Sequence, residues 1–262
     1  MIEEKVSNWS DFIEEAGEAT SQLDILFRGM RNHKWELLTT LERIGRKDES
    51  LSQYYTAINI ARSSIECCID HKWDFKEELS DADLKPDILS TGLYHLPSQE
   101  YMIYLRHHGF PSPLLDWTES PYVAAYFAYA DANPDDEYCS IYRFIEFGKN
   151  GKGGIFKPDD AKILSIGPCI STHKRHFMQQ SQYTYSVRKS DRGLIFSSHE
   201  DAMNVPGRDG DHFIKYILPI SERTGVLREL RKMNITAYTL FGTEDSLIRT
   251  LTQDEYILRG SS

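Results

Sequence analysis

The densest set of side chains that can do chemistry lies in residues 104–130. Asp116, Thr118 and Ser120 come just before Pro121, and proline is favoured in the first turn of a helix because it lacks a backbone N–H donor. A helix N-terminus has free backbone N–H groups and a positive partial charge, which together attract anions. The pattern therefore predicts a site for an anionic ligand where this helix begins.

The elements that position this site follow from the same segment. A helix over about 98–106 ends near Gly109, because glycine and the two prolines after it do not continue a helix. Residues 114–115 then predict a short buried strand. The helix that starts at Pro121 has apolar residues at helical spacing, so one face packs inward while the site stays at its N-terminal end.

The remaining chain predicts a single domain that mixes strands and helices. Residues 1–22 predict an amphipathic helix that packs on the core. Residues 23–30 predict a first strand with a bend at Gly29, and a helical insertion follows over about 49–106. Residues 148–154 predict a flexible loop. Further strands are predicted over 138–147, 162–170, 183–187, 212–219 and 236–241, and helices over 221–233 and from 244.

The composition limits the classes of function. The chain has 262 residues, enough to bury a core without metal or disulfides, and its net charge of −10 gives no general attraction to phosphates. Contact with nucleic acid would need a local basic patch, such as residues 173–176. No apolar run approaches the ~20 residues that span a bilayer. The acidic N-terminus lacks the apolar core of a secretory signal, which predicts a cytoplasmic protein.

Cysteine and histidine spacing favours neither a metal site nor a disulfide framework. Cys67, Cys68, Cys139 and Cys169 form no C-x-x-C pair, and the histidines show no His-x-x-x-His spacing. We therefore expect reduced, mostly buried thiols and no metal. This expectation disfavours a metal-dependent hydrolase or nuclease.

Three motifs resemble the FRG domain family, which is named for its Phe/Tyr-Arg-Gly motif. They are Phe27-Arg-Gly, the run His107-His-Gly-Phe-Pro-Ser-Pro-Leu-Leu-Asp-Trp-Thr-Glu-Ser-Pro with Ala124-Ala-Tyr-Phe-Ala, and Arg175-His-Phe-Met-Gln-Gln. The resemblance covers about residues 20–255. The chain departs from the family at Ser112 and Pro113, where the family usually carries Thr-Arg.

The FRG layout is similar to that of ADP-ribosyltransferases of the Arg-Ser-Glu type. This similarity implies an α+β fold with an ADP-ribosyltransferase-like split, mixed or antiparallel β-sheet core and helical insertions. The FRG/ADP-ribosyltransferase-like domain would span residues 23–257. Because the FRG family is largely uncharacterised, the reaction is inferred from the layout of these enzymes.

In that layout Arg28 would hold the phosphates of NAD, because a planar guanidinium bonds a pyrophosphate bidentately. Thr118 or Ser120 would hold the nicotinamide ribose. Glu244, with Asp245 as the alternative, would orient a ribose hydroxyl and stabilise the oxocarbenium-like transition state. Further contacts with NAD are expected from Gly29, His107 and Asp116.

The resemblance implies an NAD-dependent mono-ADP-ribosyltransferase that modifies RNA, DNA or protein. A toxin of a bacterial toxin–antitoxin or phage-defence system, with a neutralising partner protein, would have this activity. NAD would be a co-substrate, and no metal is implied. His173, Lys174 and Arg175 would contact the acceptor. The alternative function is a non-catalytic module that binds a nucleotide or a peptide.

Each candidate residue also has a structural interpretation. Arg28 can pair with Asp116 in a buried ion pair, or Asp116 can fix its own turn through side-chain hydrogen bonds. His107 near a helix C-terminus and Glu244 at a helix N-terminus are both favoured there by the helix dipole. The basic residues at 173–176 can form a solvated turn.

Overall fold

The computed structural model describes residues 1–19, 25–80, 83, 96–146, 160–166, 174–203 and 211–259. The strands are β1 (Ile2–Lys5), β2 (Ile25–Met30), β3 (Leu115–Thr118), β4 (Tyr138–Ile145), β5 (Lys162–Ile166), β6 (Ser181–Ser190), β7 (Gly193–Phe196) and β8 (His212–Pro219). The helices are α1 (Trp9–Ala19), α2 (Thr40–Arg43), α3 (Leu51–Ile69), α6 (Gln99–His107), α7 (Pro121–Tyr129), α8 (Lys174–Met178), α9 (His199–Met203), η1 (Ile220–Glu222), α10 (Arg223–Lys232), α11 (Ala237–Phe241), α12 (Glu244–Gln253) and η2 (Asp254–Leu258).

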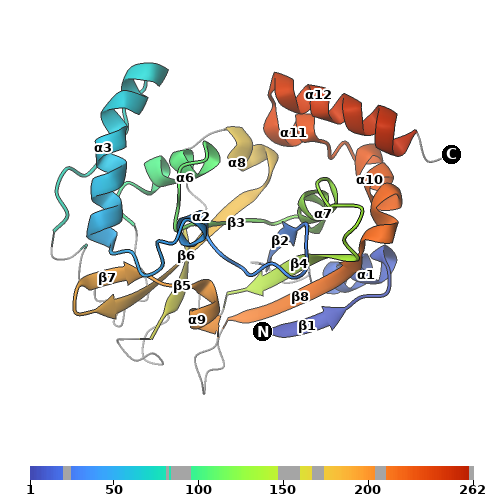
Figure 1. Cartoon of the computed structure of the whole chain (residues 1–262), viewed down its shortest axis with the longest axis horizontal. Helices are drawn as coiled ribbons and strands as arrows, with labels where there is room; N and C mark the ends of the chain where they lie inside the picture. The colour runs from blue at the N-terminus through green and yellow to red at the C-terminus, as the bar shows by residue number, and fades with distance from the viewer. Residues whose placement is uncertain are drawn as a thin grey trace.

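The centre of the molecule is an eight-stranded sheet in the order β1-β8-β4-β2-β3-β6-β5, with β7 paired to β6. Strand β1 is parallel to β8, while the other described pairs are antiparallel. Helices α1, α7 and α10 gather at one end of the sheet, and α3 and α6 at the other (Figure 1). The predicted single α+β domain around a mixed sheet is therefore confirmed.

Apolar side chains fill both faces of the central strands. Phe27 of β2, Ile141 of β4 and Leu218 of β8 are fully buried in one cluster with α1, α7 and α10. On the other face Phe144 and Phe213 stack with their ring centroids 4.5 Å apart. Successive side chains of a strand point to opposite faces, so a strand covered on both faces is largely apolar.

The close packing of α7 on β2 explains the glycine at position 29. Gly29 stays in register with Ile141 of β4, so the bend predicted at this position is wrong. A Cβ atom on Gly29 would lie 2.7 Å from the backbone nitrogen of Ala128 and would collide with the carbonyl oxygen of Ala124. Glycine therefore lets the helix lie directly against the strand that carries Arg28.

The N-terminal segment differs from its prediction. Residues 2–5 form strand β1, and the helix predicted over 1–22 begins at Trp9. Three of the four side chains of β1 are exposed, so no apolar alternation marks it as a strand. Backbone pairing with β8 holds this edge strand in place. Helix α1 packs on the core as predicted, with Phe12 fully buried.

The segment predicted as a strand over 236–241 is helix α11. Thr236 and Thr239 form a capping box, in which each hydroxyl accepts a hydrogen bond from the backbone N–H of the other. Gly242 ends the helix in the left-handed conformation, with φ of 64°. These caps outweigh the strand-like composition of the segment.

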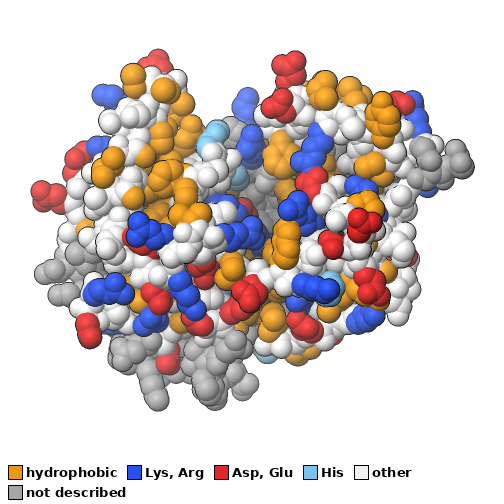
Figure 2. All heavy atoms as spheres, in the orientation of Figure 1, with side chains coloured by type: hydrophobic (Ala, Val, Ile, Leu, Met, Phe, Trp, Pro, Cys, Tyr) orange, Lys and Arg blue, Asp and Glu red, His pale blue; other side chains and the backbone are white. Residues whose placement is uncertain are grey.

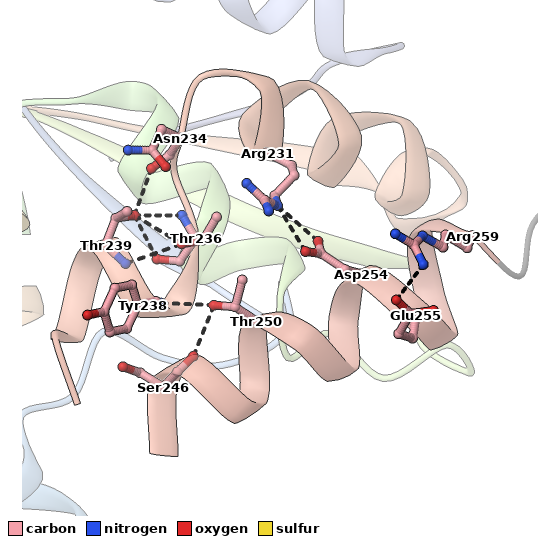
Figure 3. A network of polar contacts seen from close by, with 10 residues as sticks. All are labelled: Arg231, Asn234, Thr236, Tyr238, Thr239, Ser246, Thr250, Asp254, Glu255 and Arg259. Atoms are coloured by element: carbon pink, nitrogen blue, oxygen red, sulfur yellow. Dashed lines mark hydrogen bonds and ion pairs between the residues drawn. The ribbon is translucent and has the colours of Figure 1, made fainter. Parts of the chain in front are cut away.

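Helix α12 turns small polar residues inward and apolar residues outward. The Thr250 hydroxyl accepts a hydrogen bond from the Tyr238 N–H and donates one to the Ser246 carbonyl, both at 2.9 Å (Figure 3). Arg231 of α10 donates to both carboxylate oxygens of Asp254, at 3.0 and 3.1 Å. Polar contacts thus attach this helix to the domain. Its exposed apolar side chains are Leu247, Ile248 and Leu251.

The other predicted strands and helices are present. The predicted helix over 98–106 is α6, and β4, β5, β6, β8 and α10 lie at their predicted positions. Strand β7 and helix α9 were not predicted, because each is only four or five residues long. The loop predicted over 148–154 lies outside the described residues.

Two thiols differ from the prediction. Cys67 and Cys68 are exposed on α3, whereas Cys139 is buried as expected. Cys169 lies outside the described residues. Across the described ranges no helix is long and apolar enough to cross a membrane.

Candidate functional site

The central sheet opens between β2 and β3. Strand β2 pairs with β4 along its whole length, but with β3 at a single position, where Phe27 lies opposite Thr118. Continuing that register would pair Gly29 with Asp116. The strands part instead, and Arg28 Nη1 donates a hydrogen bond of 2.6 Å to the carbonyl oxygen of Asp116. The guanidinium group thus supplies a donor to a backbone carbonyl at the gap in the ladder.

A cavity of about 470 Å³ lies at this gap. Five arginines line it, but the carboxylates in its described lining are those of Asp116 and Asp131. The whole chain carries a net charge of −10, so this excess of positive charge is local. Figure 2 shows Lys and Arg side chains on both sides of a hollow at the centre of this face. The arginines are Arg28, Arg31, Arg43, Arg106 and Arg175.

Arg28 is partly buried and has a free donor. Its Nε–H is buried and has no hydrogen-bond partner within the described residues. Burial lowers the pKa of Arg28 to about 10, an effect that the Asp116 charge opposes and the Arg106 and Arg43 charges reinforce. Arg28 therefore remains cationic at neutral pH. An anion in the cavity would offset the repulsion among these arginines.

Asp116 is held by Arg106. Arg106 Nε and Nη2 lie 3.2 and 2.8 Å from the two carboxylate oxygens of Asp116. Burial alone would raise the pKa of Asp116, but the charges of Arg106 and Arg28 outweigh it and hold that pKa below its usual value. The alternative interpretation, an Arg28–Asp116 ion pair, is wrong about the partner. Arg28 instead bonds the backbone carbonyl of Asp116.

His107 lines the cavity and is anchored by α8 and β6. Its Nε2 lies 2.7 Å from the hydroxyl oxygen of Tyr183, and its carbonyl oxygen accepts a 3.1 Å hydrogen bond from Arg175 Nη1. The same hydroxyl lies 3.3 Å from Nδ1 of the buried His176. Burial lowers the pKa of His176, which favours the neutral form of this histidine. Helix α8 therefore ties the end of α6 to β6.

The two predicted hydroxyls support the fold. Thr118 donates a hydrogen bond of 2.7 Å to the Gln179 carbonyl and accepts one of 3.1 Å from the Ser120 N–H. Ser120 caps α7 by accepting a hydrogen bond from the Val123 N–H, and Pro121 occupies the first turn as predicted. Thr118 and Gln179 line the cavity, whereas Ser120 is not among its described lining residues.

A scan against known protein families gives one match for this chain. Residues 23–137 match the model of the FRG domain. The FRG segment contains β2, β3 and α7 and therefore the gap with Arg28, Arg106 and Asp116. The resemblance expected over 20–255 is thus supported for less than half of the chain, and the Arg175 motif lies beyond the match. No curated protein and no solved structure matches the chain significantly.

The predicted acid and acceptor residues lie mostly outside the cavity. Glu244, the first residue of α12, and Asp245 are exposed and are not among the described lining residues. Helix α11, in place of the predicted strand, contributes Phe241 to the lining. Lys174 is exposed at the start of α8 and does not line the cavity. His173 lies outside the described residues, while Arg175 is part of the lining.

Sequence reasoning missed several residues of the cavity. Arg106 lies inside the FRG segment. A cation at the C-terminal end of a helix is favoured there by the helix dipole, so this position alone does not indicate a site residue. Asp131 follows α7 and is paired with Arg249, and no motif marks Arg31 or Trp35. Within the described ranges no group of three His, Cys, Asp or Glu side chains is placed to hold a metal ion.

Proposed function

We propose that the cavity binds a nucleotide through its phosphate groups, and that NAD is the ligand. The observation that carries this proposal is the set of five arginines around one cavity in an acidic protein. Of the two lining carboxylates, Asp116 is already neutralised by Arg106 and Asp131 by Arg249. The arginines therefore exceed the available protein anions, and a diphosphate supplies the missing negative charge.

The size and the lining of the cavity suit a nucleotide better than a bare phosphate. A volume of about 470 Å³ falls in the range of small-molecule sites, which span roughly 300–1,000 Å³. Aromatic rings of Trp35, Phe127 and Phe241 also line it and offer flat surfaces to a base. The guanidinium group of Arg28, which lines the cavity, supplies donors for a phosphate oxygen. Arg28 and Arg43 are the residues we expect to hold the diphosphate.

We propose ADP-ribosyl transfer as a second function of the same cavity. It is favoured by the meeting of Arg28, Gly29, His107 and Thr118, all expected at the NAD site of such enzymes, in one lining. The bond between the nicotinamide nitrogen and the ribose carbon breaks, and its electron pair leaves with nicotinamide. A lone pair of the acceptor forms the new bond to that carbon, and the acceptor loses a proton to water.

The second proposal requires a carboxylate that stabilises the positive charge on the ribose. Glu244 is exposed outside the described lining, so we assign the role to Asp131, the lining carboxylate that is not bridged to Arg106. To act on the ribose, Asp131 must give up its ion pair with Arg249. A carboxylate near the developing positive charge is the largest expected electrostatic contribution to such a reaction. Without a carboxylate so placed, the cavity would bind NAD and leave it intact.

Calorimetric titration with NAD, combined with chromatography of released nicotinamide, tests both functions. Arg43→Gln removes a lining charge without breaking a hydrogen bond of the described structure and should weaken NAD binding at least tenfold. The matched control Arg192→Gln, on an exposed turn, should leave binding unchanged. Failure of the wild-type protein to bind NAD would contradict the proposal.

The wild-type protein and Glu244→Gln should release nicotinamide from NAD, and Asp131→Asn should not. This pattern would support the transferase. Tight binding of NAD without release would leave the non-catalytic nucleotide-binding module as the function. Release that depends on Glu244 and not on Asp131 would return the acid to the residue expected from the sequence.

A further inference from the structure

Two parts of the cavity lining pair a cation with an aromatic ring at the surface. The guanidinium carbon of Arg31 lies 4.5 Å from the ring centre of Trp35, and Trp35 is 38% exposed. On the α8 side, the guanidinium carbon of Arg175 lies 5.5 Å from the ring centre of Phe241. The neighbouring Phe177 is 71% exposed. A cation beside an exposed ring offers a ligand both positive charge and a flat apolar face.

Not all cations of the protein are held in ion pairs. Elsewhere Lys47 is paired with Asp201 and Arg62 with Glu77. Across the described residues, four cations at or beside the cavity take part in no ion pair. They are Arg31, Lys34, Arg43 and Lys174.

We propose that this rim, formed by Arg31, Lys34, Trp35, Lys174 and Phe177, binds single-stranded nucleic acid. The inference that the strand is the ADP-ribose acceptor rests on the proposed second function. Binding of the strand to the rim can be measured independently of that function. A single strand presents phosphates and the open faces of its bases, which suits alternating cations and exposed rings. A duplex hides those base faces, and an acidic peptide offers charge without flat rings.

The charge distribution favours this place for the strand. With a net charge of −10 the chain as a whole repels a polyanion, while the excess of arginines at the cavity attracts it locally. A strand held on the rim therefore lies across the mouth of the cavity. This position brings a nucleotide of the strand next to the NAD held by Arg28 and Arg43.

Fluorescence anisotropy with labelled 12-nucleotide RNA and DNA, the matching duplex and an oligoglutamate peptide tests this inference. We expect both single strands to bind more tightly than the duplex and the peptide. Trp35→Ala and Phe177→Ala should each weaken binding about tenfold, the usual effect of losing one stacked base. Tyr256→Ala, which removes a ring that is 82% exposed on η2, is the matched control and should have no effect.

The salt dependence gives a second readout. With about four phosphates neutralised, the logarithm of the binding constant should fall with the logarithm of salt concentration with a slope of about −3. Arg31→Gln should make this slope shallower by about 0.7, and Arg192→Gln should not change it. Circular dichroism and thermal melting of every variant exclude loss of the fold as the cause.

The outcomes separate this inference from the proposed function. Phe177 does not line the cavity, so Phe177→Ala should weaken strand binding and leave NAD binding intact. Binding of NAD with no preference for single strands, or strand binding unaffected by Trp35→Ala and Phe177→Ala, would overturn the inference and leave the NAD site standing. Tight binding of the peptide instead would identify an acidic protein as the partner.

Discussion

The ion pair between Arg106 and Asp116 joins the end of α6 to β3 and carries a prediction about how the cavity is held together. Arg106→Gln removes the positive charge from a bidentate pair. Asp116 is then left in a partly desolvated position, where the charge of Arg28 still lowers its pKa. The variant should therefore lose stability and shift the position of β3 relative to α6.

The geometry sets the size of this loss. Hydrogen bonds to charged groups contribute about 1.5–3 kcal/mol each, and a fully buried pair broken on one side costs about 3–5 kcal/mol. The Arg106 side chain is 13% exposed and that of Asp116 is 34% exposed, so solvent screens part of the interaction. We expect a loss of about 2 kcal/mol in the free energy of unfolding, or about 4–8 °C in Tm for a domain of this size.

Urea unfolding of Arg106→Gln, Asp116→Asn and the double variant measures the pair itself. We expect a coupling energy of about 1.5–2 kcal/mol, since the double variant no longer leaves an unpaired charge. The exposed pair of Arg259 with Glu255 is the control, and its coupling should stay below about 0.5 kcal/mol. A coupling at Arg106 and Asp116 no larger than the control would refute the reasoning.

The pH dependence gives an independent check on the same pair. Because the pKa of Asp116 is lowered in the folded protein, its stabilising effect is complete above its ordinary pKa, near 3.8, and is lost as the pH falls through the lower folded value. The difference in stability between the wild-type protein and Arg106→Gln should therefore be full at pH 7 and become smaller only as the pH falls well below 3.8. A difference that stays constant over this range would mean that the Asp116 charge is not involved.

Three further changes test the packing. Gly29→Ala should cost at least about 3 kcal/mol, because its Cβ meets the backbone of α7, while the control Gly225→Ala, with open space at its Cβ, should stabilise by about 0.5–1 kcal/mol. Thr250→Val should cost about 1–2 kcal/mol by removing its hydrogen bonds, whereas the exposed Thr252→Val should cost under about 0.5 kcal/mol. Since burial lowers the pKa of His176, stability should fall as the pH drops below about 6.5, and His176→Gln should flatten that fall.

Urea unfolding measures all three. An equal cost for Gly29→Ala and Gly225→Ala would contradict the close approach of α7 to β2. Equal effects at positions 250 and 252 would show that α12 is held by something other than its inward hydroxyl groups. An unchanged pH profile in His176→Gln would place the titrating group elsewhere.

The parts of the fold that local chemistry determines could be predicted from the sequence. Ser120 and Pro121 begin α7 as expected, because a cap and a first-turn proline act within one turn of helix. The strand over 212–219 follows from its alternation and its final proline. Helix α11 differs from the prediction because the capping box of Thr236 and Thr239 outweighs the strand-like pattern of the segment.

The assembly of the cavity could be predicted only in part. Arg28, Asp116, His107 and Thr118 come together because β2 and β3 share a single pair and then separate, a feature that no window of sequence records. Arg106 joins them through the angle between α6 and β3, which is a property of the packed domain. Glu244 begins α12, directly after the helix α11 that stands where a strand was predicted, and it is not among the described lining residues.

The most direct test of the central claim compares the affinity of NAD with that of nicotinamide riboside and adenosine, which carry the same rings without the diphosphate. If the arginines bind the phosphates, NAD should bind at least about 100-fold more tightly than either nucleoside, as expected for two charge-assisted contacts of about 1.5 kcal/mol or more each. Inorganic pyrophosphate should also displace NAD. Nucleosides that bind as tightly as NAD, with no competition by pyrophosphate, would contradict the claim that the five arginines form a phosphate site.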